Sequence, residues 1–236
     1  MVEDAEALRL RAAEEIVRAV ARAISEKGRC TLCLAGGTTP AGAYETIAAH
    51  HAGALDWSRV DFFWNDERCV PPDDPSSNFG LAQRTLLSRL GPCSDRVHRM
   101  RGEIAPQEGA RDYEVRLARV FTGLPRFDLL LLGLGDDAHI ASLFPGHPAL
   151  EERQRWVLPV EVEAPVRHRL TLTSPVLNNA ARILFLVSGE KKAAAVRSVL
   201  GGQRDARTFP AQLIGPSDGH VTWLIDRAAE PRGLAL

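Results

Sequence analysis

Short apolar segments alternate with longer amphipathic ones along most of this chain, and this alternation restricts the fold more than any other feature. Apolar runs typical of strands buried on both faces lie at residues 31–35, 60–64, 127–132 and 182–187. Residues 5–26, by contrast, carry apolar side chains at helical spacing with charged side chains between them. The pattern predicts an α/β fold with a doubly wound, mainly parallel sheet and helices on both faces.

Weaker signals complete this prediction. Further strands are expected near residues 97–100, 156–160, 169–173 and 220–226. Helices are expected over 5–26, from Pro40 with Thr39 as N-cap, over 79–90 with Asn78 as cap, over 106–121, and after Ser174-Pro175 and Ser188-Gly189. The polar, proline-rich residues 65–78 are expected to form a long loop, and such loops are often functional.

We expect one domain over residues 1–236, because the chain shows no linker and no internal repeat. The net charge is -1, so nothing indicates binding to nucleic acid or to an anionic membrane surface. No apolar run approaches the roughly 20 residues of a membrane span, and the acidic N-terminus is unlike a signal peptide. We therefore expect a cytoplasmic protein, and we expect it to be a monomer.

Cys30 and Cys33 have the C-x-x-C spacing of zinc and redox sites, but they lie in or beside a predicted strand. Residues three apart on a strand face opposite sides, so the two thiols could not bind one metal ion. No second pair completes a site, and the four cysteines, which include Cys69 and Cys93, are interpreted as structural.

In a sheet of this kind, ligands bind beyond the carboxyl ends of the strands. Gly36, Gly37 and Thr38 follow the strand at 31–35 and enter a helix, where backbone N–H groups and hydroxyls can bind an anion such as phosphate. A tight turn that requires glycine explains the same residues equally well. No Gly-Lys-Ser/Thr follows, which excludes a Walker A loop.

Lys191 and Lys192 are two of only three lysines in the chain, and they stand at the start of a predicted helix. Cations in a first helical turn oppose the helix dipole, at a cost of about 0.3–1 kcal/mol each when exposed. A bound anion would reverse that effect, so this pair favours an anion site slightly over a solvated surface.

Asp66, Glu67 and Arg68 follow the strand at 60–64. Two adjacent carboxylates beside an Arg fit either a structural ion-pair network or an active-site cluster. Taken alone, these three residues favour the network.

Residues 133–139 (GLGDDAH) follow the most apolar strand and match the G-x-G-x-x-A pattern of dinucleotide sites. Against that interpretation, Asp136 and Asp137 would repel a pyrophosphate, and Pro145 leaves room for only a short helix. The alternative is a catalytic His139, with Asp137 two residues away to orient it or stabilise its charge.

Other catalytic patterns are missing from the sequence. It contains no G-x-S-x-G nucleophile elbow, and no His-x-x-x-His or Cys/His cluster predicts a metal site. The remaining histidines, His50 and His98 among them, are expected to be structural or at the surface.

Taken in order, these segments resemble the 6-phosphogluconolactonases, the lactonase branch of the glucosamine/galactosamine-6-phosphate isomerase superfamily. The resemblance extends from about residue 30 to 226, and 141–146 (ASLFPG) most favours the lactonase branch. The residues that carry it are 34–40 (LAGGTTP), 64–70 (WNDERCV) with Ser77-Asn78, 133–146 (GLGDDAHIASLFPG), 169–173 (RLTLT) and 189–193 (GEKKA).

The resemblance implies a Rossmann-like fold of the sugar-phosphate isomerase type and hydrolysis of 6-phospho-D-glucono-1,5-lactone to 6-phospho-D-gluconate, in the oxidative pentose phosphate pathway. It implies neither a metal nor an organic cofactor. In this interpretation His139 activates water as a base beside Asp137. The implied substrate-binding residues are Gly36, Gly37, Thr38, Asp66, Arg68, Arg169 and Lys192, with the phosphate held by the three loop residues, Arg169 and Lys192.

Two departures from the usual pattern flank His139. Ala138 and Ile140 stand where the family usually has Gly and Thr. If position 138 needs a positive φ, Ala costs about 1 kcal/mol there and can shift the loop.

A deaminase is the second hypothesis, because Ile140 resembles the related glucosamine-6-phosphate deaminases and Asp66 aligns with their proton-abstracting Asp. Those enzymes carry a carboxylate where this chain has Phe144, and a phenyl ring cannot transfer protons. A non-catalytic sugar-phosphate sensor is the third hypothesis. The region before residue 30 has room for one helix only, which counts against a helix-turn-helix sensor but not against a stand-alone binder.

Overall fold

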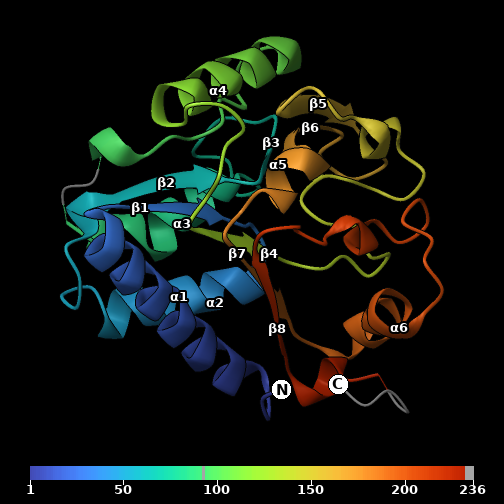
Figure 1. The fold of residues 1–236 in the computed structure, drawn as a ribbon, viewed down its shortest axis with the longest axis horizontal. Helices are drawn as coiled ribbons and strands as arrows, with labels where there is room; N and C mark the ends of the chain where they lie inside the picture. Colours follow the sequence, from blue (N-terminus) through green and yellow to red (C-terminus); the bar gives the residue numbers. More distant parts are fainter. Residues whose placement is uncertain (92–93, 232–236) are drawn as a thin grey trace.

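A five-stranded parallel sheet forms the centre of the computed structural model, which describes residues 1–91 and 94–231 (Figure 1). The strand order is β2-β1-β4-β7-β8, so the order reverses between β1 and β4. A crevice for ligands forms beyond the carboxyl ends of the strands at such a reversal. The strands are β1 (Cys30–Leu34), β2 (Val60–Trp64), β4 (Leu129–Leu132), β7 (Arg182–Val187) and β8 (His220–Ile225).

Helices cover both faces of this sheet, as predicted. One core joins one face to α1 (Ala5–Lys27), α2 (Thr38–His50) and α3 (Asn78–Thr85). The other core joins the opposite face to α4 (Pro106–Val120), α5 (Ser174–Asn178) and α6 (Ala193–Gly201). The doubly wound arrangement follows from strands that are apolar on both sides.

The cysteine prediction is confirmed within the described residues. Cys30 packs in the core beneath α1, whereas Cys33 packs in the core beneath α4, so the two thiols face opposite sides of the sheet. Both are free and buried, and Cys69 is free and partly buried. Cys93 lies outside the described residues.

A second, antiparallel sheet of three strands corrects the sequence prediction. It has the order β3-β6-β5 and comprises β3 (Asp66–Arg68), β5 (Val157–Glu161) and β6 (His168–Leu172). The strands expected near 156–160 and 169–173 therefore exist outside the parallel sheet, and residues 65–78 are not entirely loop. Polar residues 66–68 form a strand because β6 pairs with them, and that partner is about 100 residues away in the chain.

Several boundaries also differ from the prediction. Residues 97–100 form no strand but a single bridge between Phe62 and Val97. Gly37, and not Thr39, is the N-cap of α2, and Ser77, and not Asn78, caps α3 through its hydroxyl. The third helix ends at Thr85, and a 3₁₀ turn precedes α6. Apolar periodicity locates a helix but not the loop contacts that determine its first residue.

Two buried tyrosines bind the backbone at the ends of the strands that lead into the crevice. The Tyr44 hydroxyl accepts from the N–H of Ala35 (3.0 Å) and donates to its carbonyl (2.8 Å), just beyond β1. The Tyr113 hydroxyl makes the same two bonds with Trp64, the last residue of β2 (2.9 and 3.0 Å). The chain therefore leaves the sheet at fixed points on both strands.

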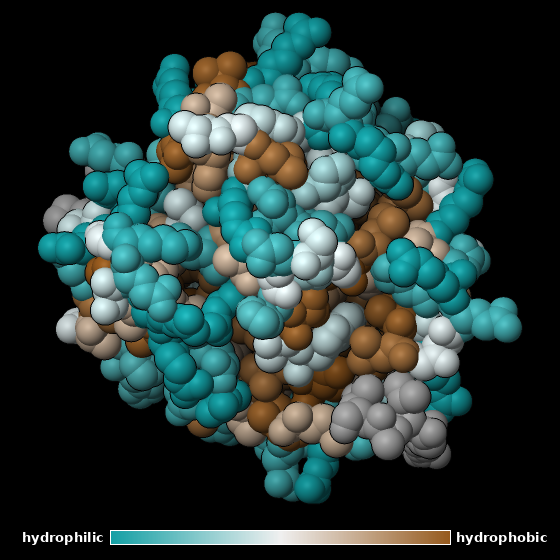
Figure 2. All heavy atoms as spheres, in the orientation of Figure 1, coloured by the Kyte–Doolittle hydropathy of each residue, from teal (hydrophilic) through white to brown (hydrophobic). Residues whose placement is uncertain are grey.

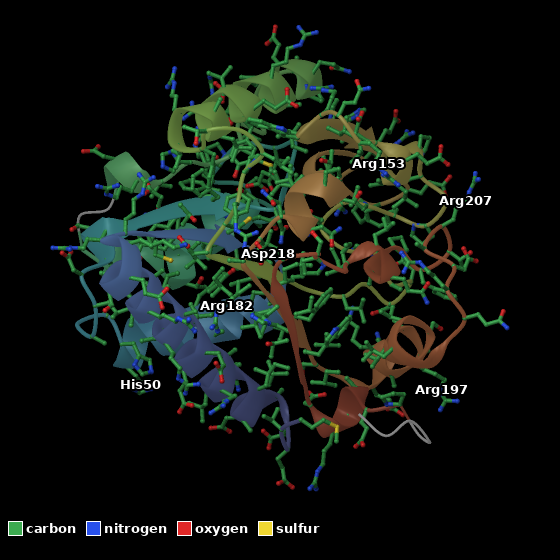
Figure 3. The ribbon with its side chains drawn as sticks, in the orientation of Figure 1. His50, Arg153, Arg182, Arg197, Arg207 and Asp218 are labelled. Atoms are coloured by element: carbon green, nitrogen blue, oxygen red, sulfur yellow. The ribbon has the colours of Figure 1, made fainter. Side chains whose placement is uncertain are left out.

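The surface seen in one view is mostly polar. Hydrophilic side chains cover most of the face seen in Figure 2. His50 is exposed at the end of α2 (Figure 3), as expected. His98 contacts Asp61 at 2.9 Å and stacks on Phe63, so it is structural. No described helix is both long enough and apolar enough to cross a membrane.

Candidate active site

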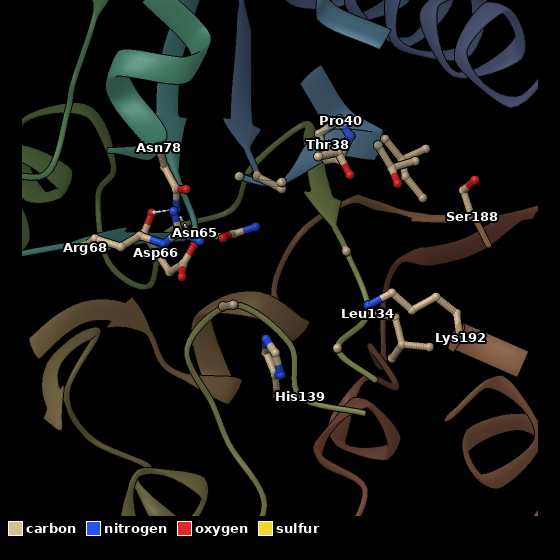
Figure 4. A pocket seen from close by; sticks show the side chains of 18 of the residues that line it. Thr38, Pro40, Asn65, Asp66, Arg68, Asn78, Leu134, His139, Ser188 and Lys192 are labelled. Carbon is tan, nitrogen blue, oxygen red and sulfur yellow. Dashed lines mark hydrogen bonds between the residues drawn. The ribbon is translucent and has the colours of Figure 1, made fainter. Parts of the chain in front are cut away.

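A pocket of about 220 Å³ lies at the carboxyl ends of β1, β2, β4 and β7 (Figure 4). It brings together residues from the segments that follow these strands, from β3 and β6 and from the start of α3, far apart in the sequence. The predicted site residues that line it are Gly36, Gly37, Thr38, Asp66, Arg68, His139, Arg169 and Lys192. Asp137 is not part of the lining and contacts the His139 ring instead.

The start of α2 forms one wall of the pocket. Its N-cap, Gly37, has a φ of 102°, a conformation that residues with a side chain rarely adopt. Within the described residues, no protein group accepts a hydrogen bond from the N–H of Gly36, Gly37 or Thr38. Free N–H groups at a helix N-terminus favour an anion, because the helix dipole places positive charge there.

Three cationic side chains of the described residues, Lys192, Arg169 and Arg68, line the same pocket. The Lys192 ammonium lies 2.6 Å from a carboxylate oxygen of Asp136, and Figure 4 shows the side chain extending toward the pocket. Its neighbour Lys191 is exposed and does not line the pocket. Burial lowers the pKa of Arg169, the nearby charge of Asp66 opposes this, and Arg68 adds to the lowering. An anion in the pocket would therefore relieve repulsion between cations.

His139 and Asp137 form a close pair in the loop after β4. Nδ1 of His139 lies 2.6 Å from Oδ1 of Asp137, and the His139 backbone N–H donates to the same oxygen at 3.1 Å. Burial raises the pKa of Asp137, but the hydrogen bonds and charge of His139 outweigh it, so the pKa is lowered overall. A charged Asp137 holds the proton on Nδ1, which leaves Nε2 able to take a proton.

Gly135 makes room for this pair. A Cβ at position 135 would lie 2.0 Å from Nδ1 of His139 and 2.5 Å from Oδ1 of Asp137. No helix begins within residues 133–139, where a dinucleotide fingerprint requires one. The second glycine of the G-x-G-x-x-A match, Gly135, is therefore explained by the His–Asp contact.

Phe144 lies between two of the predicted site residues. Its ring stacks on His139 with centroids 4.1 Å apart and an interplanar angle of 19°. The Arg169 guanidinium lies 5.4 Å from the Phe144 ring centroid. Stacking of the Phe144 ring restricts the rotation of His139.

The His139 loop contains two alanines in the left-handed region. Ala138 has a φ of 65° and Ala141 a φ of 48°. Position 138 therefore does have the positive φ that would favour glycine, and Ala costs about 1 kcal/mol there relative to Gly. Ala138 is fully buried and its carbonyl accepts from the N–H of Ala211 (3.0 Å), so the loop keeps this conformation despite the strain.

The short strand β3 divides its side chains between two roles. Asp66 and Arg68 point into the pocket, because residues two apart on a strand share a face. Arg68 Nη1 donates to the Ser76 carbonyl at 2.5 Å, and its buried Nε has no hydrogen-bond partner. Glu67 faces the other way and accepts from the N–H groups of Asn78 and Phe79, both at 2.7 Å. The predicted ion-pair network is not seen in the described residues, because Glu67 binds backbone N–H groups, whereas Asp66 and Arg68 line the pocket.

Sequence reasoning assigned no role in the site to several polar residues. Asn65, Asn78 and Ser188 line the pocket, and Ser142 is fully buried in the His139 loop. Asn78 was interpreted as a helix cap. The signal that could have found it is the Ser77-Asn78 pair within the segments of the family resemblance. Ser142 also lies in one of those segments, 141–146 (ASLFPG), but its apolar neighbours give it no signal of its own.

Comparison with known proteins relates this pocket to one family. The sequence profile described as glucosamine-6-phosphate isomerases/6-phosphogluconolactonase matches residues 3–223. A 6-phosphogluconolactonase from Synechocystis sp. is 38% identical over 215 residues, which cover 89% of this chain and 87% of that one.

Solved structures give the same relationship. The 6-phosphogluconolactonase from Trypanosoma brucei has a TM-score of 0.86 and 27% identity, over 97% of this chain and 96% of that one. A monomeric glucosamine-6-phosphate deaminase has a TM-score of 0.80 and 26% identity, over 96% of both chains. The fold is thus shared by both activities, and the pocket residues must distinguish them.

Proposed function

The chain belongs to the family of glucosamine-6-phosphate isomerases and 6-phosphogluconolactonases, and from this premise we propose that its pocket hydrolyses 6-phospho-D-glucono-1,5-lactone to 6-phospho-D-gluconate with His139 as the base. It is a lactone hydrolase of the 6-phosphogluconolactonase type, whose reaction is a step of the oxidative pentose phosphate pathway. The observation that carries the residue assignment is the His139–Asp137 contact, which leaves Nε2 free beside an anion site.

His139 moves the proton in this proposal. Nε2 takes a proton from water as the water oxygen attacks the lactone carbonyl carbon, and the carbonyl oxygen becomes an oxyanion. When the carbonyl re-forms, the bond to the ring oxygen breaks and the imidazolium returns its proton to that oxygen. Asp137 stabilises the imidazolium between the two steps. The free acid then ionises to the carboxylate.

Arg68 is proposed to stabilise the charge that develops during attack. Its guanidinium lines the pocket, and only Nη1 is used by a protein carbonyl in the described residues. The hydrogen bond from a donor fixed in this way becomes stronger as negative charge forms on the carbonyl oxygen. It therefore stabilises the transition state more than the substrate, which lowers the activation barrier.

The substrate phosphate is proposed to bind at the start of α2. The N–H groups of Gly36, Gly37 and Thr38 supply donors, and Lys192 and Arg169 supply charge. Phosphate binding remote from the carbonyl does not itself speed the chemistry, but it positions the lactone against His139.

The deaminase alternative lacks its proton donor in this pocket. Phe144 stacks on His139 at the position of the deaminase carboxylate. Asp66, which aligns with the proton-abstracting residue, already accepts hydrogen bonds from Asn78 and Ser142. These contacts favour the lactonase.

An assay on freshly prepared 6-phosphogluconolactone tests the proposal. Folded protein should hydrolyse it well above the spontaneous rate, measured in the same buffer without protein. A rate equal to the blank would refute the lactonase, and ammonia release from glucosamine 6-phosphate would support the deaminase instead. Binding of 6-phosphogluconate without turnover of either substrate would indicate the non-catalytic sensor.

We further propose that the enzyme acts as a cytoplasmic monomer and without a metal ion, since His139 supplies the activation of water. Turnover should then be unchanged after dialysis against EDTA, and sedimentation should give a mass near 25.8 kDa. A loss of activity that zinc or magnesium restores would contradict the metal-free mechanism.

A further inference from the structure

We propose that Asp66 and Ser142 are positioning residues: their hydrogen bond holds the loop that carries His139, and Asp66 takes no part in proton transfer. This inference rests on the proposed function, because it concerns the placement of the proposed base. Ser142 lies three residues after His139 and is fully buried. Its hydroxyl donates to Oδ2 of Asp66 at 2.6 Å.

The loop needs such a contact because its own conformation is strained. Ala138, which directly precedes His139, and Ala141, which directly precedes Ser142, both have a left-handed backbone conformation. Residues held in this region persist only where surrounding contacts compensate. On the side of Ala138, the Ala211 N–H donates to the Ala138 carbonyl. On the side of Ala141, the next residue along the chain is Ser142.

The small antiparallel sheet holds Ser142 at two points. Asp66 on β3 and Thr171 on β6 are directly paired across the strands. The backbone N–H of Ser142 donates to Oγ1 of Thr171 at 3.2 Å, and its hydroxyl donates to Asp66. Asp66 and Thr171, paired across two strands, therefore accept hydrogen bonds from the hydroxyl and the backbone N–H of Ser142. This contact gives the second sheet a role in the site.

Each carboxylate oxygen of Asp66 accepts a hydrogen bond from another part of the chain. Oδ2 accepts from Ser142, and Oδ1 accepts from Nδ2 of Asn78 at 2.8 Å. Asp66 is only 6% exposed. The same Asn78 amide also donates to the Asp66 backbone carbonyl at 3.0 Å, which fixes its orientation. Both carboxylate oxygens thus connect elements of the fold, which supports a positioning role for Asp66.

A second Asp–Ser pair, Asp226 and Ser188, serves as a control for the first. It lies on the side of the pocket proposed to bind phosphate, called the phosphate wall below, which is formed by the start of α2 and Lys192. Oδ2 of the buried Asp226 accepts from the Ser188 hydroxyl at 2.5 Å, and Oδ1 accepts from the Gly189 N–H at 3.1 Å. This pair holds the segment that leads to Lys192. Loss of the first pair should therefore affect the chemical step, and loss of the second should affect substrate binding.

Four variants test the proposal on 6-phosphogluconolactone. Ser142→Ala should lower kcat about tenfold or more and leave KM within about threefold, because the base is displaced while the phosphate wall is intact. Asp66→Ala should lower kcat to the same extent as Ser142→Ala, with the same small change in KM. Asp66→Asn should stay within about fivefold of native kcat, since its carbonyl can accept from Asn78 and its amide can donate to the Ser142 hydroxyl. Ser188→Ala should raise KM and leave kcat within about threefold.

Two readouts separate positioning from general damage. The pH profile of kcat/KM should keep its shape in Asp66→Asn, because no titrating catalytic group is removed. The NMR signals of the His139 ring should shift in Ser142→Ala and Asp66→Ala and match native in Asp66→Asn.

The proposal is overturned if Asp66→Asn loses as much kcat as Asp66→Ala, which would assign a proton or charge role to Asp66. It is also overturned if Ser142→Ala keeps native kcat and native His139 signals. A native protein with no lactone hydrolysis refutes the proposed function instead, and the NMR comparison then still tests the positioning. If Asp66→Ala does not fold, Ser142→Ala and Asp66→Asn give the same decision.

Discussion

Two helices begin next to each other at the carboxyl edge of the sheet, and their first turns find hydrogen-bond partners in opposite ways. The start of α3 is closed by the protein, because Glu67 accepts from the N–H groups of Asn78 and Phe79 and the Ser77 hydroxyl accepts from that of Gly80. The start of α2 has no side-chain cap, and its first N–H groups have no protein acceptor in the described part of the chain.

A carboxylate of the protein and a phosphate of a substrate satisfy the same kind of donor. Glu67 is only 2% exposed, and burial raises its pKa against the lowering effect of the N–H groups of Phe79, Asn78 and Arg68. At α3 the anion belongs to the fold and contributes to stability. At α2 the anion must come from outside, so the same donors contribute to binding.

Removing Glu67 should have the largest effect and should act on folding. Glu67→Ala leaves the N–H groups of Arg68, Asn78 and Phe79 without their acceptor, at a cost of about 3 kcal/mol or more in the free energy of unfolding. Urea unfolding of both proteins measures the difference. The exposed Glu45 on α2 is the matched control, and Glu45→Gln should change stability by less than about 0.5 kcal/mol. Equal effects of the two substitutions would show that α3 does not depend on its carboxylate.

Removing Lys192 should have an intermediate effect and should act on anion binding. Inorganic phosphate at about 100 times its Kd should stabilise the native protein by about 2.7 kcal/mol. Lys192→Met should weaken phosphate binding about tenfold or more, because a charge-assisted hydrogen bond is lost. Thermal unfolding with and without phosphate measures this. Lys191→Met, which alters an exposed neighbour, should keep the native shift. A native shift in Lys192→Met would place the anion elsewhere.

Removing the charge of Asp137 should have the smallest effect on stability. Like Glu67, Asp137 accepts from a backbone N–H, but its side chain is 47% exposed. Its pKa is lowered in the folded state, so its contribution is present above the ordinary carboxyl pKa of about 3.9 and is lost as pH falls through the lower folded value. Asp137→Asn should therefore be less stable than native by under about 1 kcal/mol near pH 6. That difference should shrink toward pH 3 in urea unfolding followed across pH, and a difference that grows on acidification would contradict it.

The sequence predicts the parallel sheet well because its strands carry their own signal. The runs at 60–64 and 182–187 agree with β2 and β7 to the residue, since strands buried on both faces are mostly apolar. Asp66, Glu67 and Arg68 give no such signal. They form a strand only because β6 pairs with them and because Asn78, Ser142 and the start of α3 supply their hydrogen bonds.

The residues of the candidate site also fall into those with a local sequence signal and those without one. His139 and Asp137 could be found because a titratable pair after a buried strand is unusual, and Gly36 and Gly37 because glycine has few reasons to follow a strand in pairs. The positive φ of Ala138 could be stated only as a condition, because no local pattern reveals it. The contacts of Ser142 could not be predicted, because its hydrogen-bond partners lie 76 and 29 positions away in the chain.

The most direct test of the account combines binding and turnover in one variant of His139. If the α2 wall binds the substrate and His139 performs the hydrolysis, His139→Ala should bind 6-phosphogluconate with a Kd within about threefold of native. The same variant should lose at least about 100-fold in lactone turnover, the usual contribution of a general base. Turnover near the native rate in His139→Ala would contradict the account, because the pocket would then hydrolyse its substrate without the proposed base.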